Sequence, residues 1–525
     1  MLIARIGDGA TTQYAAEMVG AKAANLARMA ALGLPVPPAF VLPIELCAAV
    51  VGGGKEARRK VAEGLGEGID FLQQTTGRRF GDRRAPLLVS VRSGAARSMP
   101  GMLNTVLDVG CTTAAVHGLV RMSGNPRFAW DCRRRFLESY GAVVLGIDPA
   151  LFAERHAALA AADDGIDCES LERLGEAFEE LIAHADETLP DDPMEQLANA
   201  AEAVYRSWMS ERASTYRKLQ HMEDLQGTAV AVQVMVFGNR DRASGAGVAF
   251  SRDPSTGAAQ PMIDFLPESQ GEDIVSGNRT PQTEDAIEGC APRAADKLRE
   301  TLRRLEREFA DVQDVEFTVE SGELSVLQTR SAKRTPLAML RFAVDFVNEG
   351  LITPQEALRR LHGLNLDGLA RQRLSSLDES VASGTGASAG VAVGRAAFSL
   401  EHAQRLASRG DPVILLRPDI NTADIAAFAV SSGIVTAVGG RTAHAALVAR
   451  QMAKPCVVGC AALTFELNGH GGGRLAGHAI KPDDWISIDG ESGGIFLGRH
   501  EVVTERPEKE LAEIKRWQTN ARLAC

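Results

Sequence analysis

The chain has 525 residues, of which 45% are hydrophobic and 24% are charged, and its formal net charge is −11. This length predicts several domains, and the acidic balance, with basic and acidic residues interspersed, excludes a general nucleic-acid-binding surface. No uninterrupted apolar stretch approaches the roughly 20 residues that span a bilayer, and the N-terminal MLIARIGDGATTQY does not have the pattern of a signal peptide.

Helix and strand patterns alternate over the first 335 residues. Residues 15–33 predict one helix with an apolar face that ends at Gly33, and residues 113–220 predict a mainly helical segment. Residues 227–238 and 245–251 predict two strands joined by a polar turn. Three further patterns are a turn into a strand at 35–42, a strand that runs into a Gly-rich loop at 86–95, and a hairpin with Ser-Gly at its turn at 315–330.

The second half of the chain changes pattern at three places. Two amphipathic helices are predicted at 336–350 and 353–364, and the small residues at 380–394 then indicate a flexible joint. Strand-like segments alternate with helical segments and Gly-rich turns up to about residue 505, and one charged helix is predicted after them. The predicted parts are 1–335, a helical linker and hinge at 336–383, an α/β domain at 384–505, and a C-terminal helix at 506–525.

The eight cysteines are scattered and form no C-x-x-C pair. Cys456 and Cys460 lie in the apolar run PCVVGC, which favours buried free thiols over a metal site. This cysteine usage, with no targeting signal in the sequence, favours a reducing cytoplasm.

Arg92 stands at the end of a predicted strand, before a loop rich in Gly and Ser, in VSVRSGAARSMPGMLNTVLDVG. Backbone N–H groups of such a loop can bind a phosphate, and a guanidinium can hold its oxygens as a fork. The alternative is an ordinary surface turn, because no GxxxxGK[ST] pattern is present. The spacing alone leaves both interpretations open.

The predicted hairpin carries two polar faces. Asp314 and Glu316 are two residues apart on one strand, and Gln328 and Arg330 are two apart on the next, so each pair shares a face. Carboxylate and amide oxygens suit Mg²⁺, and the arginine suits a phosphate held by that metal. The alternative is the solvated face of an edge hairpin.

His444 is an isolated histidine in GGRTAHAALVAR, and most isolated histidines are structural. This segment, however, predicts a strand, a Gly turn and the start of a helix. Amides and the dipole at a helix start favour a phosphate there, and Thr442 is near enough to bond the ring or the phosphoryl oxygens. A neutral imidazole is a competent nucleophile toward phosphorus.

Several long segments in the same order make the chain similar to the pyruvate phosphate dikinase and phosphoenolpyruvate synthase family, from about residue 15 to 500. The MPGM that follows Arg92 resembles the dikinase branch. The resemblance implies an α/β and α+β multidomain fold, with an ATP-grasp nucleotide-binding domain followed by a swivelling α/β phosphohistidine domain. The segments are GAKAANL, the Arg92 segment, AVQVMVFGN, SGAGVAFSRDPSTG, QGEDIVSGNRTPQ, QDVEFTVE…LQTRSAKRT and GGRTAHAALVARQMAKPCVVGC.

The resemblance also implies roles for residues at matched positions. His444 would carry the phosphoryl group, with Thr442 beside it, while Glu316 and Gln328 would hold Mg²⁺. The residues implied at the ATP site are Lys22 and Arg92 on the phosphates, Arg330 on a phosphate, Arg135 assisting the phosphoryl groups, Gln233 to Met235 along the adenine, Glu272 in the nucleotide site, and Asp314 beside the metal.

Three departures from the family pattern stand out. The segment PMIDFLPESQGED lacks the Gly-Glu-Tyr of the family's LYGEYLINAQGED, and Arg441 and Ala443 replace the usual Met and Ser next to the carrier histidine. Family members also continue into a pyruvate-binding barrel, which needs roughly 200 residues or more. After Gly498 this sequence predicts only a charged helix, so the pyruvate half of the reaction is not expected in it.

The resulting expectation is ATP- and Mg²⁺-dependent phosphorylation of His444 with release of AMP. The phosphoryl group would then pass to an acceptor that is free or bound by another chain. Inorganic phosphate or water as the acceptor of the γ-phosphoryl group stays open, as does a homodimer, and no nucleic acid or membrane partner is expected. The alternatives are the ATP/phosphate half of a dikinase that works with a separate pyruvate-binding subunit, or a non-catalytic regulatory module.

Overall fold

The computed structural model describes residues 2–9, 12–97, 99, 102–162, 167–275, 280–375, 379–419, 425–441, 444–465 and 471–523. The chain divides into two compact units. The first unit comprises Met1–Arg242 and Ser325–Thr329, and the second comprises Ala243–Leu324 and Arg330–Cys525.

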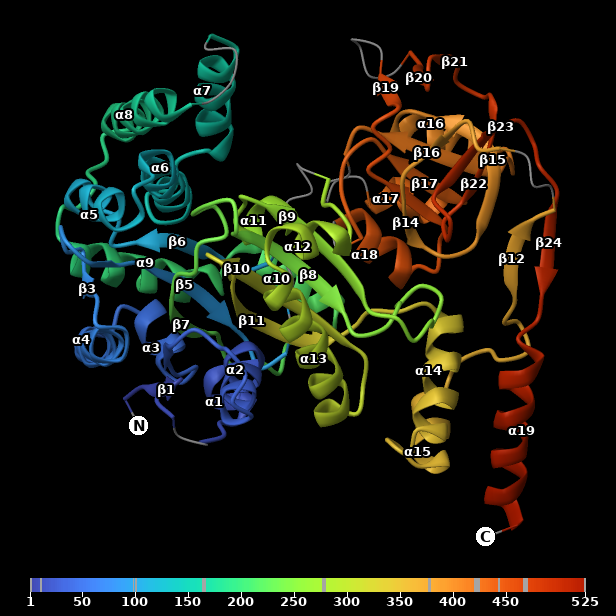
Figure 1. The fold of residues 1–525 in the computed structure, drawn as a ribbon, viewed down its shortest axis with the longest axis horizontal. Coiled ribbons are helices and arrows are strands. Elements are labelled where there is room, and N and C mark those ends of the chain that lie inside the picture. Colours follow the sequence, from blue (N-terminus) through green and yellow to red (C-terminus); the bar gives the residue numbers. More distant parts are fainter. Residues whose placement is uncertain are drawn as a thin grey trace. The chain divides into compact units, whose positions relative to one another are not determined.

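The first unit is built on an antiparallel five-stranded sheet (Figure 1). Its strands are β1 (Ala4–Ile6), β2 (Ala39–Leu42), β5 (Val89–Gly94), β6 (Thr105–Val109) and β7 (Ala229–Val234), and β3 (Arg79–Phe80) and β4 (Pro86–Leu87) form a separate pair. The strand order in the sheet is β1-β2-β7-β5-β6, so β5 and β7 are internal. Every residue of β7 is buried, which explains its unbroken apolar sequence apart from Gln233.

Helices fill most of the rest of the first unit, as the pattern at 113–220 predicts. Packing of α9 against β5 and β7, of α6 against β6 and of α4 against β2 closes one hydrophobic core. The helices are α1 (Ala16–Val19), α2 (Ala21–Ala31), α3 (Leu46–Val51), α4 (Lys55–Thr76), α5 (Thr113–Ser123), α6 (Pro126–Val143), α7 (Pro149–Ala162), α8 (Cys168–His184), α9 (Pro193–Ser207) and α10 (Glu211–Leu219).

The single helix predicted at 15–33 is interrupted at Gly20. Gly20 has φ +83°, in the left-handed region, and a Cβ there would lie 2.2 Å from the carbonyl oxygen of Gly94. The chain therefore has to change direction between α1 and α2 in order to meet the end of β5. Apolar periodicity continues through the break, which is why the sequence pattern does not reveal it.

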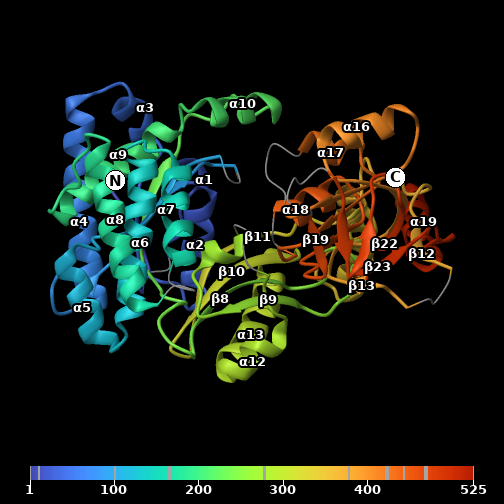
Figure 2. The ribbon, with the colours of Figure 1, turned by 90° about the horizontal axis from the view of Figure 1, so that it is seen from above.

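The second unit begins with strands of a sheet whose order is β11-β10-β8-β9, although the middle of β11, Ser325–Thr329, is counted with the first unit. Its strands are β8 (Gly245–Phe250), β9 (Met262–Pro267), β10 (Gln313–Glu320) and β11 (Glu323–Ser331), and its helices are α11 (Gly271–Val275), α12 (Glu284–Cys290) and α13 (Pro292–Phe309). Figure 2 shows α12 and α13 together on one face of this sheet, where α12 packs on β9 and α13 on β10.

The predicted hairpin is confirmed, because β10 and β11 are joined by Ser321 and Gly322, which have φ +49° and +83°. Two positive φ values match the primed turns that suit the twist of paired strands. The strands predicted at 227–238 and 245–251 are also present as β7 and β8. They do not form a pair, since β7 belongs to the five-stranded sheet and β8 to the four-stranded sheet.

An α/β module with an eight-stranded sheet follows in the second unit, and its order is β13-β23-β22-β15-β16-β17-β18-β14. The central strands β15 to β18 are parallel, and hydrophobic clusters cover both of their faces. The strands are β13 (Ala382–Ser383), β14 (Thr385–Ser388), β15 (Val391–Ala397), β16 (Val413–Arg417), β17 (Gly433–Thr436), β18 (Cys456–Val458), β22 (Trp485–Asp489) and β23 (Gly494–Leu497).

Smaller elements complete this module. The helices α16 (Leu400–Ser408), α17 (Ile425–Val430) and α18 (His444–Gln451) connect its parallel strands. A three-stranded sheet contains β19 (Leu463–Phe465), β20 (Gly473–Leu475) and β21 (His478–Ile480). Cys456 and Cys460 are buried and free, as their apolar context predicts.

The segments on either side of the module meet. Residues 336–375 contain the two predicted helices, α14 (Pro336–Asn348) and α15 (Pro354–Arg360), and then β12 (Arg371–Leu374). β12 pairs in antiparallel register with β24 (Val502–Glu505), and α19 (Glu508–Leu523) packs on α14 and α15.

Two predictions for these segments need correction. The small residues at 380–394 are not a structureless joint, because β13, β14 and much of β15 lie within them and belong to the eight-stranded sheet. The residues after Gly498 are not helical throughout, because β24 precedes α19. In both places pairing with a distant strand overrides the local pattern.

Candidate functional site

Arg92 lies on β5, where its backbone is paired with Thr105 of β6 and with Ala231 of β7. The side chain is half-buried, and its Nε atom is buried without a hydrogen-bond partner. A buried donor left unpaired costs about 1–3 kcal/mol. An anionic ligand would remove this cost, which favours the phosphate interpretation of Arg92 over an ordinary surface position.

Lys22 stands near the start of α2, close to the strand that carries Arg92. The Ala21 amide donates to the carbonyl oxygen of Ala95 at 2.9 Å, and the close approach of Gly20 to Gly94 adds a second contact between the two segments. Lys22 itself is exposed. The structure therefore brings the helix start of Lys22 to the same end of β5 as the Gly-rich loop after Arg92.

The other predicted residues of the first unit have structural partners. Arg135 Nε lies 3.0 Å from Oδ2 of Asp131, which also accepts a hydrogen bond from Asn239 Nδ2 at 2.7 Å. Gln233 is buried on β7, and its Nε2 donates to the carbonyl oxygen of Pro37 at 3.2 Å. Met235 is buried just beyond β7. These contacts hold the side chains of Arg135 and Gln233.

The β10–β11 hairpin brings together Asp314, Glu316 and Arg330, which all belong to the second unit. Arg330 Nε donates to Oδ2 of Asp314 at 2.8 Å, and Arg330 Nη2 lies 3.9 Å from Oε1 of Glu316. Asp314 is buried opposite Phe250, and Glu316 lies opposite Val248. The prediction that the hairpin joins carboxylates to an arginine is thus confirmed for Asp314 and Arg330.

Burial and charge compete in this cluster. Burial raises the pKa of Asp314, and the neighbouring Arg330 opposes the rise. Burial lowers the pKa of Arg330, but the two carboxylates outweigh it and raise the pKa overall. Asp314 and Arg330 therefore depend on each other for a favourable charge state.

The oxygens of this cluster fit a hard divalent cation. Asp314 Oδ1 is buried without a hydrogen-bond partner, which leaves a lone pair for a cation. Gln328, the predicted amide ligand, is buried on β11 two residues before Arg330. Across the described residues no three His, Cys, Asp or Glu side chains gather as metal ligands, so any cation here would also need oxygens from its substrate. Glu272 is exposed in the first turn of α11.

The predicted carrier residue His444 is the first residue of α18, the helix that follows β17 in the chain. Gly439 has φ +109°, so the chain turns there through a conformation that side chains disfavour. This confirms the predicted order of strand, Gly turn and helix start. Thr442, Ala443 and the side chain of His444 lie outside the described residues.

Arg441, three residues before His444, makes a contact that sequence reasoning missed. Its backbone N–H donates to Oδ2 of Asp264 at 2.9 Å, and its Nη1 donates to Oδ1 at 3.1 Å. The Asp264 side chain, on β9, is only 6% exposed, and burial raises its pKa although Arg441 opposes the rise. The sequence did contain a signal for this contact. Asp264 and Arg441 both lie in segments that depart from the family pattern, and two such departures can compensate for each other.

Two neighbours shape the same loop. The buried Arg450 of α18 donates from Nη2 to the carbonyl oxygen of Arg441 at 2.7 Å and from Nη1 to that of Ala387 at 2.7 Å. At Gly440 a Cβ would lie 2.7 Å from Pro281, so only glycine fits at this contact. Gly440 and Arg441 are thus held by contacts on two sides.

Comparison with known proteins gives this arrangement a family. The description "Pyruvate phosphate dikinase, AMP/ATP-binding domain" matches residues 16–289, just over half of the chain. The chain belongs to the pyruvate phosphate dikinase family. A second description, "PEP-utilising enzyme, mobile domain", matches residues 410–493. The first range contains Lys22 and Arg92, the second contains His444, and the β10–β11 hairpin lies outside both.

Similar curated proteins carry the same name. The pyruvate, phosphate dikinase of Clostridium symbiosum is 38% identical over 518 residues, which cover 95% of this chain and 58% of that protein. The chloroplastic enzyme of Flaveria trinervia is 39% identical over 515 residues, covering 96% and 54%. That of Rhizobium meliloti (strain 1021) is 39% identical over 531 residues, covering 96% and 58%. The chain therefore spans little more than half the length of these relatives.

No helix among the described residues combines the length and the apolar character that crossing a bilayer requires.

Proposed function

We propose that this chain is a phosphotransferase that binds ATP with Mg²⁺, transfers the β-phosphoryl group of ATP to His444 and releases AMP. The observation that carries the proposal is the position of His444. It is the first residue of α18, five residues after the positive-φ Gly439 that follows β17, inside the segment that matches the mobile domain of PEP-utilising enzymes. Carboxyl ends of parallel strands and helix starts are where phosphate groups bind in α/β folds.

The chain's own residues can position ATP for this transfer. Arg92, with its unpaired buried Nε, and Lys22, at the helix start beside the same loop, offset charge on the phosphates. Arg330, held by Asp314, would bind a phosphate from the hairpin. Glu316 and Gln328, with the free oxygen of Asp314, would hold Mg²⁺. When bound, the ion would neutralise negative charge on the phosphate oxygens.

The transfer depends mainly on the alignment of ATP with His444 and on the neutralisation of phosphate charge. A neutral ring nitrogen of His444 attacks the β-phosphorus, and the bond from this phosphorus to the oxygen shared with the α-phosphorus breaks, so that AMP leaves. His444 then carries both the β- and the γ-phosphoryl groups. Inorganic phosphate or water attacks the γ-phosphorus, the bond from this phosphorus to the oxygen shared with the β-phosphorus breaks, and pyrophosphate or phosphate leaves while the β-phosphoryl group stays on His444. Free amides at the start of α18 would stabilise the charge of the phosphoryl group on His444.

The final acceptor belongs to a second step. The chain spans little more than half the length of the relatives that it matches. The phosphoryl group would go to an acceptor that is free or held by another chain. The second candidate is the ATP/phosphate half of a dikinase that works with a separate pyruvate-binding subunit. A non-catalytic module is disfavoured, because Lys22, Arg92, Glu316, Gln328, Arg330 and His444 are all retained.

The test is incubation of the chain with β-phosphate-labelled ATP and Mg²⁺, with and without inorganic phosphate, followed by peptide mapping. An acid-labile, base-stable label on the peptide of His444 is expected, together with AMP. His444→Asn should bind ATP but take up no label, Thr442→Ala should label weakly, and Glu316→Ala or Arg330→Ala should form no AMP. Label on another residue, or equal labelling of His444→Asn, would overturn the proposal.

A further inference from the structure

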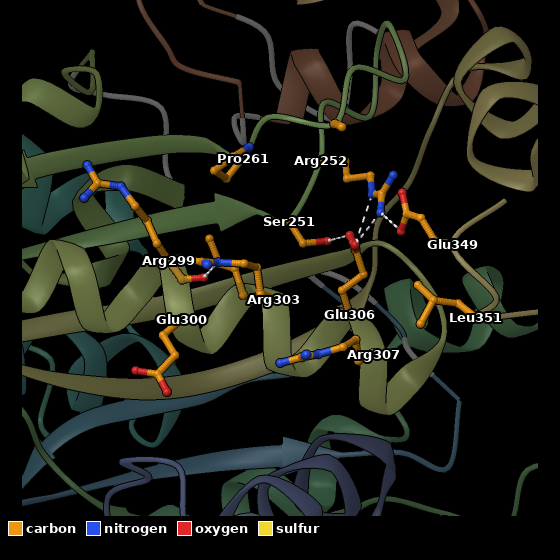
Figure 3. A pocket seen from close by; sticks show the side chains of 12 residues that line it. Ser251, Arg252, Pro261, Arg299, Glu300, Arg303, Glu306, Arg307, Glu349 and Leu351 are labelled. Carbon is orange, nitrogen blue, oxygen red and sulfur yellow. Dashed lines mark hydrogen bonds and ion pairs between the residues drawn. The ribbon is translucent and has the colours of Figure 1, made fainter. Parts of the chain in front are cut away.

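A cavity of about 630 Å³ lies in the second unit, beside α13 and the segment that follows β8 (Figure 3). None of the residues assigned above to ATP, Mg²⁺ or phosphoryl transfer lines it. Arginines, glutamates and apolar side chains share the lining. The lining residues are Ser251, Arg252, Ala259, Pro261, Arg299, Glu300, Leu302, Arg303, Glu306, Arg307, Glu349 and Leu351.

Three of the arginines form a row. Arg299, Arg303 and Arg307 are four residues apart in succession on α13, so they follow one face of the helix into the cavity. Arg299 is already paired with Glu284, Asp296 and Glu288. Arg303 and Arg307 are exposed, and among the described residues neither guanidinium has an acidic partner. Two positive charges of the row therefore face the cavity without compensation.

The acidic residues at the other end of the cavity, Glu306 and Glu349, share one cation, Arg252. Arg252, whose side chain is 6% exposed, donates to Glu306 from Nε at 3.0 Å and from Nη2 at 2.8 Å. Its Nη2 also lies 2.6 Å from Glu349, while its Nη1 donates no hydrogen bond and lies 3.5 Å from Asp345. Figure 3 shows this cluster apart from Arg299, with the carboxylate of Glu300 turned away from it.

We propose that this cavity binds a small organic anion with at least two negative charges, with Arg303 and Arg307 as its charge partners. Its volume falls within the roughly 300–1,000 Å³ of small-molecule pockets. Pro261, Leu302 and Leu351 supply an apolar wall for the organic part of the ligand. A phosphorylated or a carboxylated metabolite meets this description, because both present oxygens that a guanidinium fork can hold.

The site is connected to the hairpin of the proposed ATP site. The Ser251 hydroxyl donates to Glu306 at 2.7 Å and accepts from the backbone N–H of Gln313 at 3.0 Å. Gln313 immediately precedes Asp314, the partner of Arg330. A ligand that moved Glu306 would therefore act on the strand that positions Asp314, and the cavity is placed to hold an effector of the proposed activity.

Binding to the full-length chain tests the proposal, with pyrophosphate and citrate as separate probes in isothermal titration calorimetry. Because pyrophosphate would also enter the proposed ATP site, all titrations use the Arg330→Ala background. Replacing Arg303 and Arg307 together by Ala should weaken binding by about tenfold or more, since each loses a charge-assisted contact. The matched control is Arg293→Ala with Arg304→Ala, which removes two exposed arginines of α13 that do not line the cavity.

The two probes distinguish the source of the anion. Binding of pyrophosphate alone would identify a phosphorylated ligand, and binding of citrate alone a carboxylated one. The proposal is overturned if neither probe binds at millimolar concentration, or if the cavity pair and the control pair weaken binding equally. The failure of labelling at His444 would leave these results unaffected, so the two proposals can fail separately.

Discussion

Asp264 and Asp314 are buried and Asp131 is half-buried, and the pKa values of these three carboxyl groups shift in different directions. Burial alone would raise all three, and it does raise the pKa of Asp264 and Asp314, each of which is paired with one arginine. Asp131 is held by both Arg134 and Arg135, and these two cations lower its pKa overall. Two guanidiniums contact Asp131 directly, whereas one contacts each of the other two carboxylates, and Arg450 adds positive charge near those two without a hydrogen bond to either. Direct hydrogen bonds from two cations favour the ionised form most strongly.

Asp131→Asn should therefore lower stability in a pH-dependent way. The pKa of Asp131 is lower in the folded chain than in the unfolded one, so its ionised form stabilises the fold above the unfolded value near 4 and the effect is lost as the pH falls through the folded value. Removing the charge takes one ion-pair partner from Arg135 and one from Arg134, which keeps Glu138, and should cost about 3 kcal/mol at neutral pH. Urea unfolding at pH 7 and below pH 4 measures this, and a constant difference from the parent chain would contradict it.

Arg441→Met, which restores the residue usual in the family, should slow labelling of His444 while leaving ATP affinity unchanged. The variant loses the side-chain bond to Asp264 that holds Arg441, three residues before His444. Loss of one buried charged contact should reduce the labelling rate about tenfold. Rapid-quench labelling and equilibrium ATP binding separate the two effects.

A double-mutant cycle provides the control for Arg441. If the two residues act as a pair, Asp264→Ala combined with Arg441→Met should be little slower than either single variant. Fully additive losses would show that Arg441 acts without Asp264.

At the scale of elements, short segments are placed by contacts that span long distances in sequence. The junction of α1 and α2 meets the end of β5, and the loop before α18 meets β9. Both junctions use a glycine because a backbone or a proline approaches too closely for a side chain. The elements that carry Lys22 and His444 are thus oriented by tight contacts at their starts.

Gly20→Ala should be strongly destabilising and should weaken ATP binding. The new Cβ would collide with the backbone of Gly94 at 2.2 Å, and the residue would also keep an unfavourable positive φ. Both α2 and the loop after Arg92 would have to shift. Gly33→Ala is the matched control, because Gly33 has φ +71° but nothing within 4 Å of the added carbon.

The control variant should lose about 1 kcal/mol from the backbone conformation alone, and Gly20→Ala should lose several times more. Thermal unfolding compares the two stabilities, and equal losses would mean that the contact with Gly94 does not restrain the α1–α2 junction.

At the scale of the whole molecule, the last helix returns to the middle of the chain. Leu511, Ile514 and Trp517 of α19 are buried in one cluster with residues of α14 and α15, and Arg341 of α14 lies 3.3 Å from Glu510. The paired strands β12 and β24 lie between these helices and the α/β module along the chain. The segments that precede and follow the α/β module therefore contact each other twice, through the strands β12 and β24 and through the packing of α19 on α14 and α15.

Trp517→Ala should destabilise this helical cluster by about 3–5 kcal/mol, the usual cost of emptying a large buried site. Lys515→Ala, on the exposed face of the same helix, should change stability by less than about 0.5 kcal/mol. Hydrogen exchange should show the loss in α14, α15 and α19. Unchanged protection in these helices after Trp517→Ala would contradict their packing as one cluster.

The sequence by itself determined the local elements that carry chemistry. Alternating residues with Ser321 and Gly322 between them specify the β10–β11 hairpin, and the order of apolar strand, glycines and small helical residues specifies the start of α18 at His444. Long sequence motifs, in the same order as in the dikinase family, also indicated the family without any knowledge of tertiary contacts. These features are readable because their determinants lie within a few neighbouring residues.

Only the tertiary structure decided which distant elements meet. Three features depend on partners far along the chain. They are the break at Gly20, the assignment of β7 and β8 to different sheets, and the pairing of β13 with β23 and of β14 with β18. The pair between Asp264 and Arg441 joins residues 177 positions apart, and the cavity of Arg303 and Arg307 is closed by residues of other elements. Such contacts are set by packing and by the burial of charge, and local periodicity carries no record of either.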